Sequence, residues 1–342
     1  MIRIGVIGYG YWGPNLVRNF NEVADGQVVA VSDTRAERRA LVEARYPSVR
    51  ATSDHRDLLN DPSIDAILIA TPVHTHFPLA LEAMGKGKHV WVEKPMTTTS
   101  DEGVRLINEA DRRGLVLHVD HTFVYTGAVR KIHELVTSDT LGRIYYYDAV
   151  RVNLGLFQSD VNVIWDLAVH DLSIMDYVLP SQPYAVSATG VGHVSGRPEN
   201  VAYMTLFYED STIGHVHANW LAPVKVRRTL IGGSSKMIVY DDLEASEKVK
   251  VYDKGLKLDE QGDARYQVLV GYRTGDMWAP HIETTEALQT EAVQFLDCIT
   301  HQERSLTDGE AGLRVVRVLE AATLSMSRRG QVVELDRSTV AA

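Results

Sequence analysis

A chain of 342 residues is long enough for two domains, each with a hydrophobic core of its own. Acidic side chains outnumber basic ones, 45 to 35, and the net charge of −10 excludes the basic surface that nucleic-acid binding needs. The single cysteine, Cys298, excludes an internal disulfide and is expected to be an inert core residue. No apolar run approaches the roughly 18 residues of a membrane span, and the chain starts without a leader, so we expect a cytoplasmic protein that binds no membrane.

The chain opens with a short apolar strand over residues 4–7, and a helix is predicted over residues 14–20. Gly8, Gly10 and Gly13 stand between them at the spacing G-x-G-x-x-G. Gly8 permits the tight turn, Gly10 lets phosphates approach the backbone, and Gly13 lets the helix pack closely on the strand. A strand, a glycine turn and a helix N-terminus together predict a pyrophosphate site.

A second apolar strand, residues 28–31, is followed by Asp33, roughly 20 residues past the glycines. A carboxylate at this strand end accepts hydrogen bonds from both ribose hydroxyls of an adenosine and repels a 2′-phosphate, which favours NAD. Arg35, Arg38 and Arg39 follow closely and leave NADP open as the alternative cofactor. The structural alternative is that Asp33 only caps the helix that begins near Arg35.

The alternation of strand and helix continues to about residue 121. Strands are predicted over 66–70, 89–93 and 115–119, and helices over 35–46, 54–59, 76–84 and from a capping box at Thr99–Glu102 to Gly114. This alternation predicts a doubly wound parallel sheet, so we expect an α/β Rossmann domain over residues 1–121.

The pattern changes beyond residue 142. Strands are predicted over 144–152, 184–194, 202–208, 212–220, 225–232, 237–240 and 249–252, and helices over 166–179, 285–300 and 309–328. Successive strands without helices between them predict an open, mostly antiparallel sheet in an α+β domain over residues 122–342. The two closing helices are counted with this domain, and packing on the first domain is the alternative for them. We expect the ligand cleft between the domains, and a homodimer or homotetramer formed through the exposed face of the open sheet.

Glu93-Lys94-Pro95 stands at the carboxyl end of a predicted parallel strand, the edge at which such sheets bind ligands. The ammonium group of Lys94 can hydrogen-bond a substrate hydroxyl there and stabilise a developing alkoxide. Burial beside an oxidised nicotinamide would also lower the pKa of this amine. The alternative is that Glu93 and Lys94 form only a surface ion pair.

Asp166 and His170 are four residues apart in a predicted helix and therefore share one of its faces. A histidine whose ring is oriented by a carboxylate is a suitable base for an alcohol proton. Asp171 is turned about 100° away and is the less suitable partner. The alternative is that Asp166 and His170 form an exposed helix pair.

Histidines also stand in two His-x-His pairs, His74/His76 and His215/His217. His76 starts a helix beside the predicted cofactor strand and is expected to cap that helix or to line the pocket. Two histidines without a carboxylate or cysteine neighbour make a poor zinc site, so no metal is expected.

In this order, these motifs resemble the glucose–fructose oxidoreductase/inositol dehydrogenase (Gfo/Idh/MocA) family over essentially the whole chain. The resemblance implies NAD(P)-linked oxidoreduction of a sugar or cyclitol hydroxyl. Lys94 is similar to the family's active-site lysine, His170 to its proton-transfer histidine, and Asp166 to the carboxylate that binds substrate and orients that histidine. The cofactor site that it implies consists of Gly8, Gly10, Tyr11, Trp12, Gly13, Asp33, Thr34, Arg35, Thr71, Pro72, His76, Glu93 and Lys94, with Tyr11 and Trp12 beside the nicotinamide.

Within the family, residues 151–155 and 162–166 are most similar to the branch that acts on nucleotide-activated sugars, chiefly 3-dehydrogenases of UDP-amino sugars. This resemblance makes Tyr125, Arg151 and Asn153 candidates for substrate contact, beside Lys94, Asp166 and His170. The polar stretch 271–276 becomes a candidate for contact with the diphosphate or base. The alternative for Tyr125, Arg151, Asn153 and the stretch 271–276 is that they are ordinary structural residues of strands and turns.

One departure from the family pattern follows His121, where Thr122 and Phe123 replace the asparagine and arginine of many relatives. Alternative functions also stay open at this point. They are a free-sugar or inositol dehydrogenase, a keto-sugar reductase, an NAD-dependent glycosidase, and a nucleotide-sensing regulator that binds cofactor without turnover.

Overall fold

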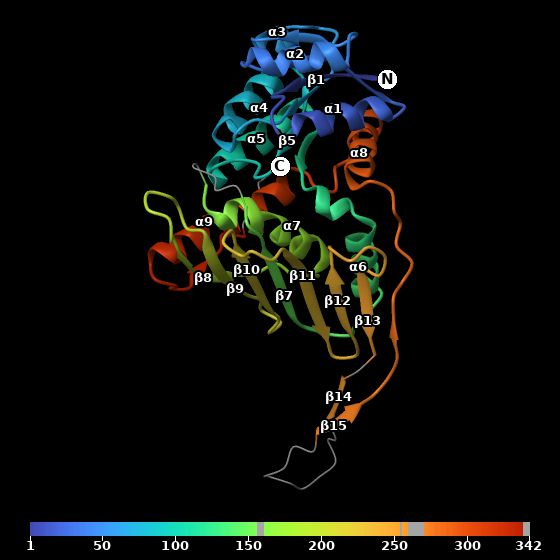
Figure 1. Ribbon diagram of the computed structural model, residues 1–342, viewed down its shortest axis with the longest axis vertical. Coiled ribbons are helices and arrows are strands. Elements are labelled where there is room, and N and C mark those ends of the chain that lie inside the picture. The colour runs from blue at the N-terminus through green and yellow to red at the C-terminus, as the bar shows by residue number, and fades with distance from the viewer. Residues whose placement is uncertain (156–160, 254, 259–269, 338–342) are drawn as a thin grey trace. The chain divides into compact units, whose positions relative to one another are not determined.

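The computed structural model describes residues 1–155, 161–253, 255–258 and 270–337 (Figure 1). By internal contacts the chain forms two compact units. Unit 1 contains Met1–Thr126 and Thr285–Glu320, and unit 2 contains Gly127–Thr284 and Ala321–Asp336. Thr285–Glu320 lies within the predicted second domain, 122–342, whose closing helices were expected either to stay with it or to pack on the first domain, and by its contacts this segment groups with unit 1.

Unit 1 is built on a six-stranded sheet in the order β3-β2-β1-β4-β5-β6, in which every neighbouring pair is parallel. This strand order confirms the predicted doubly wound Rossmann sheet. The strands are β1 (Ile2–Ile7), β2 (Gly26–Ser32), β3 (Arg50–Thr52), β4 (Ala66–Ile69), β5 (His89–Glu93) and β6 (Leu117–Asp120). The helices are α1 (Gly13–Glu22), α2 (Ala36–Arg45), α3 (Arg56–Leu59), η1 (Val73–Thr75), α4 (His76–Gly85), α5 (Ser100–Arg113), η2 (Thr122–Tyr125), α8 (Ala287–His301) and the first part of α9 (Gly309–Ser327).

Helix α5 begins and ends where its sequence predicts. The Thr99 side chain caps it by accepting a hydrogen bond from the backbone N–H of Glu102 at 3.3 Å. The Glu102 carboxylate reaches back to the backbone N–H of Thr98 at 3.2 Å, one residue earlier than in the usual capping box. The helix ends at Gly114, which adopts the left-handed conformation with φ +64°.

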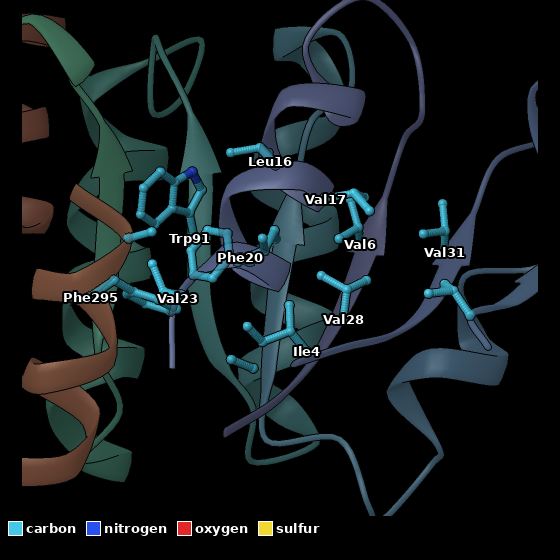
Figure 2. Close-up of a cluster of buried hydrophobic side chains, with 14 of the residues drawn as sticks. Ile4, Val6, Leu16, Val17, Phe20, Val23, Val28, Val31, Trp91 and Phe295 are labelled. Atoms are coloured by element: carbon cyan, nitrogen blue, oxygen red, sulfur yellow. The ribbon is translucent and has the colours of Figure 1, made fainter. Parts of the chain in front are cut away.

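The core of unit 1 explains why α8 belongs to it. Phe295 from α8 meets Trp91 of β5 edge to face, with ring centroids 5.5 Å apart, and Phe20 of α1 contacts Trp91 at 5.2 Å. Figure 2 shows these rings pointing toward one another beside Ile4 and Val6 of β1. All three aromatic side chains are fully buried. Buried aromatic rings of this size dominate core energetics, so α8 is part of the Rossmann core.

Unit 2 is built on a nine-stranded sheet in the order β16-β13-β12-β11-β7-β10-β9-β8-β17, and β14 pairs separately with β15. Only β10 and β7 run parallel, so the open, mostly antiparallel sheet is confirmed. The strands are β7 (Ile144–Val152), β8 (Ala185–Val191), β9 (Val201–Phe207), β10 (Ile213–Asn219), β11 (Val226–Gly233), β12 (Met237–Asp241), β13 (Val249–Tyr252), β14 (Gly255–Leu258), β15 (Val270–Arg273), β16 (Met277–Trp278) and β17 (Val333–Glu334). Its helices are α6 (Gly127–Thr137), η3 (Ile164–Ala168), α7 (Val169–Val178) and the end of α9. None of the helices in the described part of the chain has the length and apolarity needed to cross a bilayer.

Candidate functional site

The glycine turn between β1 and α1 has the geometry of a pyrophosphate site. Gly8 has φ +96°, and a Cβ on it would lie 2.4 Å from the carbonyl oxygen of Ala70. A Cβ on Gly13 would lie 2.2 Å from the carbonyl oxygen of Gly8, so neither position accepts a side chain. A Cβ on Gly10 would meet only the Arg35 guanidinium, at 3.5 Å, so the backbone of Gly10 is open to a ligand. This turn and the N-terminus of α1 fit the pyrophosphate of a dinucleotide.

Asp33 lies directly after β2, and its side chain is almost fully buried. Its carboxylate accepts hydrogen bonds from the backbone N–H of Tyr9 at 2.8 Å and of Arg35 at 2.9 Å, and Nε of Arg35 pairs with it at 3.1 Å. Burial alone would raise the pKa of Asp33, but the hydrogen bonds from Arg35 and Tyr9 outweigh burial and hold the pKa below its usual value. Helix α2 begins after Arg35 without a side-chain cap, so Asp33 is not its N-cap.

Changing Asp33 to Asn should move cofactor preference from NAD toward NADP. The charge that repels a 2′-phosphate disappears, and the exposed Arg35 guanidinium is released from its ion pair to bind a phosphate. We expect the Kd for NAD to rise about tenfold and the Kd for NADP to fall, as measured by fluorescence titration. The matched control is Glu37→Gln, which removes an exposed charge from the same helix start. An unchanged ratio of the two Kd values in Asp33→Asn would contradict this role.

His76, a predicted cofactor-site residue, contacts the backbone of two loops in unit 1. The ring is buried, with Nδ1 2.9 Å from the carbonyl oxygen of Pro95 and Nε2 2.8 Å from that of Thr71. Both nitrogens therefore face backbone oxygens of the protein itself. His76 connects the loop after β4, which contains Thr71 and the exposed Pro72, to the loop that follows Lys94. We therefore describe it as a positioning residue for both loops.

Lys94 follows β5 and precedes a cis peptide bond to Pro95. Its neighbour Glu93 does not form the simple surface ion pair that was the alternative, because Glu93 Oε1 is buried and the side chain faces Asp120 of β6. Glu93 and Asp120 are direct register partners at the carboxyl edge of the parallel sheet. Lys94 thus lies at the ligand-binding edge of unit 1, as the sequence predicts.

Glu93, Asp120 and Glu291 form a cluster of carboxyl groups at this edge, which we call the carboxyl cluster. Glu291 comes from α8 and is fully buried, and its Oε1 lies 3.0 Å from Nε2 of His118. Burial, together with repulsion from Asp120, raises the pKa of Glu93 and of Glu291 well above the ordinary value. Of the three carboxyl groups, these two glutamates therefore bind a proton more readily than an ordinary glutamate does. Sequence reasoning missed this cluster because Glu291 lies far from the other two residues along the chain.

Glu291→Gln should stabilise the protein at neutral and alkaline pH. An acid whose pKa is higher in the folded state than its ordinary 4.5 makes the folded state bind more protons, so stability falls as pH rises from the unfolded-state pKa toward the folded-state pKa. Glutamine removes this loss, of about 1.4 kcal/mol per pH unit in that interval, while its oxygen still accepts from His118. We expect Tm to rise more at pH 8 than at pH 5, measured by thermal unfolding. The exposed Glu303→Gln is the control, and an equal shift in both variants would contradict the explanation.

Tyr125 and Arg151, two candidates for substrate contact, are buried and bind side chains of their own units. The Tyr125 hydroxyl of unit 1 is buried and donates to Gln294 Oε1 at 2.6 Å. The Arg151 guanidinium of β7 is buried in unit 2 and binds both carboxylate oxygens of Asp171, at 2.7 and 3.1 Å. Asp171, which the sequence places as the weaker partner of His170, thus pairs with Arg151.

Asp166 and His170 lie in unit 2, but not on one continuous α-helix as predicted. Asp166 belongs to a single π-helical turn, η3, and His170 is the second residue of α7. Both side chains are half-buried, and Asp166 Oδ2 accepts a hydrogen bond from Nε1 of the buried Trp220 at 3.1 Å. Isolated π turns are frequent at functional sites. The apolar spacing of this segment does not distinguish a π turn from an α-helix, which is why the sequence predicts only the latter.

Asn153 lies close to this histidine-bearing segment. A Cβ on Gly155 would lie 2.9 Å from Trp220 Cδ1 and 3.3 Å from Asn153 Nδ2, which places Asn153 next to the indole that binds Asp166. Asn153 is half-buried, so part of its side chain is accessible and it stays a candidate for substrate contact.

The predicted polar stretch 271–276 divides into two parts. Its first three residues lie in β15, and its last three residues are exposed.

The remaining predicted positions are exposed or form pairs of another kind. Tyr11 is 89% exposed beside Gly10, and Thr34 is exposed beside Asp33. His215 pairs with Asp148 at 3.1 Å across two strands, a carboxylate neighbour that sequence spacing does not reveal. Within the ranges that the structure describes, no three His, Cys, Asp or Glu side chains are grouped as ligands for a metal ion.

Family models match both parts of the chain. The model described as oxidoreductase family, NAD-binding Rossmann fold, matches residues 2–121, and the GFO/IDH/MocA C-terminal domain matches residues 129–239. Among curated proteins, the chain is similar to UDP-N-acetylglucosamine 3-dehydrogenase of Acidithiobacillus ferrooxidans, with 30% identity over 92% of this chain and 94% of the relative. It is also similar to myo-inositol 2-dehydrogenase of Thermotoga maritima, with 24% identity over 97% of this chain and 98% of the relative.

Solved structures of sugar dehydrogenases have the same fold as this chain. The crystal structure of the Acidithiobacillus ferrooxidans enzyme matches with a TM-score of 0.79 and 27% identity, over 96% of this chain and 98% of that one. A levoglucosan dehydrogenase solved with NADH and L-sorbose shares the fold, with a TM-score of 0.81 over 98% of this chain and 99% of that one. Sequence models, a full-length relative and the glycine turn with its strand-end aspartate lead to one conclusion. The chain belongs to the Gfo/Idh/MocA family of NAD-dependent oxidoreductases that act on sugar and polyol hydroxyls.

Proposed function

We propose that the protein is a dehydrogenase of a nucleotide-activated sugar that oxidises the C3 hydroxyl of a UDP-amino sugar, with the reverse reduction as the same chemistry. The observation that carries the proposal is the full-length similarity to a UDP-N-acetylglucosamine 3-dehydrogenase, at 30% identity over 92% of this chain. Lys94, Asp166 and His170 support it, because each stands where the family motif has its corresponding residue.

Each of these residues has a separate task in the proposed reaction. The Lys94 ammonium donates a hydrogen bond to the hydroxyl oxygen and stabilises the negative charge that develops on it. The His170 imidazole accepts the hydroxyl proton, and Asp166 binds the sugar and orients that ring. NAD, when bound, supplies the hydride acceptor. The Trp220 indole N–H restrains the Asp166 carboxylate, since it donates a hydrogen bond to Oδ2.

The test is incubation with NAD and a panel of UDP-sugars, dTDP-sugars, free sugars and inositols, followed by NADH absorbance. We expect NADH to form fastest with a UDP-amino sugar. NADH formation only with an inositol would favour the second candidate, to which the Thermotoga maritima relative points. Cleavage of a glycoside without net NADH would indicate a hydrolase, and NAD binding without any turnover a regulator. Each of these three results would overturn the proposal.

We also infer that copies of the chain associate through the open sheet of unit 2. Tyr203 and Ile213 are 45% and 46% exposed, and His217 stacks on Tyr203 with centroids 4.3 Å apart. These residues occupy alternate positions on β9 and β10 and so share one face. Exposed apolar side chains gathered on one face are typical of an interface between identical subunits.

Tyr203→Lys should convert a dimer or tetramer into a monomer, because it places an unpaired charge in the buried interface. The measurement is sedimentation velocity. Leu41→Lys, on the exposed side of α2, is the matched control and should leave the assembly unchanged. A wild-type protein that sediments as a monomer would contradict the inference.

A further inference from the structure

The carboxyl cluster lies in the half of unit 1 that faces the nicotinamide end of the cofactor. A sheet with the order 3-2-1-4-5-6 consists of two mononucleotide-binding halves. Asp33 follows β2 in the first half, where the adenosine ribose binds. Glu93 and Asp120 end β5 and β6 in the second half, immediately before Lys94 and His121.

Asp120 is the member of this cluster whose two carboxyl oxygens both accept hydrogen bonds from neighbouring side chains. Its carboxylate accepts from Nε1 of Trp12 at 2.9 Å and from the hydroxyl of Thr122, and both donors are neutral. Glu93 Oε1 and Glu291 Oε2 are buried, and neither has a hydrogen-bond partner among the residues that the structure describes. The hydrogen-bond donors near the cluster are thus aimed at Asp120, whereas burial and repulsion from Asp120 disfavour charge on the two glutamates.

The surrounding histidines do not neutralise the charge of Asp120. His121 is 1% exposed, and neither ring nitrogen has a hydrogen-bond partner among the described residues. Burial lowers the pKa of His121 to about 4, and burial also lowers that of His118 well below its usual value. Both rings are therefore neutral at physiological pH. The positive charge of Lys94 acts on both Glu93 and His121.

We propose that Asp120 is a specificity-determining residue that makes the protein bind the oxidised cofactor more tightly than the reduced one. The nicotinamide ring is positively charged in NAD⁺ and neutral in NADH. A buried carboxylate attracts the charged ring and has little effect on the neutral one, and Asp120 is only 2% exposed, so water screens this attraction weakly. The consequence for turnover is easier release of NADH than of NAD⁺. This inference concerns the cofactor alone and holds whichever sugar is the substrate.

The test compares two isosteric substitutions at register partners. Asp120→Asn removes the charge, whereas Glu93→Gln keeps the neutral form and the ability to donate a hydrogen bond. We measure Kd for NAD⁺ and for NADH by fluorescence titration without any sugar, with the exposed Glu303→Gln as control. In Asp120→Asn we expect the Kd for NAD⁺ to rise about tenfold or more and that for NADH to change less than about twofold. In Glu303→Gln the ratio of the two Kd values should stay at the wild-type value, and in Glu93→Gln it should change far less than in Asp120→Asn.

Two results would overturn the proposal. One is an unchanged ratio in Asp120→Asn, and the other is an equal loss of NAD⁺ preference in Glu93→Gln. If Asp120→Asn does not fold, the double variant Glu93→Gln/Glu291→Gln decides, because it leaves Asp120 as the only carboxylate of the cluster. In this double variant the Kd for NAD⁺ should stay lower than the Kd for NADH. Loss of that difference would show that Asp120 is not the residue that favours NAD⁺, and it would overturn the proposal. These titrations use no sugar, so their outcome is separate from that of the substrate panel.

Discussion

Lys94→Ala lowers kcat by about a thousandfold while the Kd for NAD stays within about threefold of the wild-type value: this is the expected result if the ammonium group stabilises the developing alkoxide. Lys94 stands at the carboxyl edge of the sheet, after β5. The turn at Gly8–Gly13 and Asp33, the predicted cofactor site, lie at β1 and β2, in the other half of the sheet. Loss of the lysine therefore leaves their geometry intact.

The measurement is steady-state kinetics with the best sugar of the panel, together with a fluorescence titration of NAD. Lys86→Ala, at the exposed end of α4, is the matched control and should keep full activity. Lys94→Arg should not restore turnover, because a guanidinium presents its donors in a different geometry from an ammonium. Equal losses of turnover and of NAD affinity in Lys94→Ala would show that the lysine only supports cofactor binding.

Asp171→Ala is expected to lower the free energy of unfolding by about 3–5 kcal/mol. It leaves the buried guanidinium of Arg151 in the interior of unit 2 without the carboxylate that binds two of its nitrogens. Burial is nearly complete on both sides, with side chains 3% and 4% exposed. An uncompensated charge at such a position is one of the largest single destabilising effects in a folded protein.

Urea unfolding followed by circular dichroism measures this effect. Asp148→Ala is the control, because its contact with His215 is about two-fifths exposed on both sides, and even a charged pair with that exposure contributes only about 0–1 kcal/mol. The double variant Arg151→Met/Asp171→Leu should recover most of the loss, since it removes both charges together. Similar costs for Asp171→Ala and Asp148→Ala would mean that the buried pair is not important for stability.

The strand order and the glycine turn are predictable from the sequence because local rules determine them. Continuous apolar runs such as residues 66–69 predict strands buried on both faces, and β4 is such a strand. Gly8 is predictable for the same reason, because only glycine tolerates its backbone angle and the close approach of Ala70. The position of Asp33 is also predictable, because it comes directly after the next apolar strand in the sequence.

Other features depend on contacts between distant segments, and the sequence does not indicate them. Arg151 shows no sign of its partner Asp171, because their pairing arises when α7 packs on β7. His76 has the same limitation, since both of its carbonyl partners lie in other loops. Glu291 resembles a solvent-facing glutamate of an amphipathic helix until α8 is placed against β6, where His118 binds it.

The position of Phe295 and Glu291 in α8 has a consequence for synthesis of the chain. All six strands of the Rossmann sheet have left the ribosome long before α8 is made, but Phe20 and Trp91 lack their third ring until then. Until α8 is synthesised, part of the apolar core of the nascent amino-terminal segment therefore stays exposed to solvent. Exposed apolar surface of this kind is what chaperones bind. A truncated product that stops before residue 287 would display this apolar surface permanently and should aggregate.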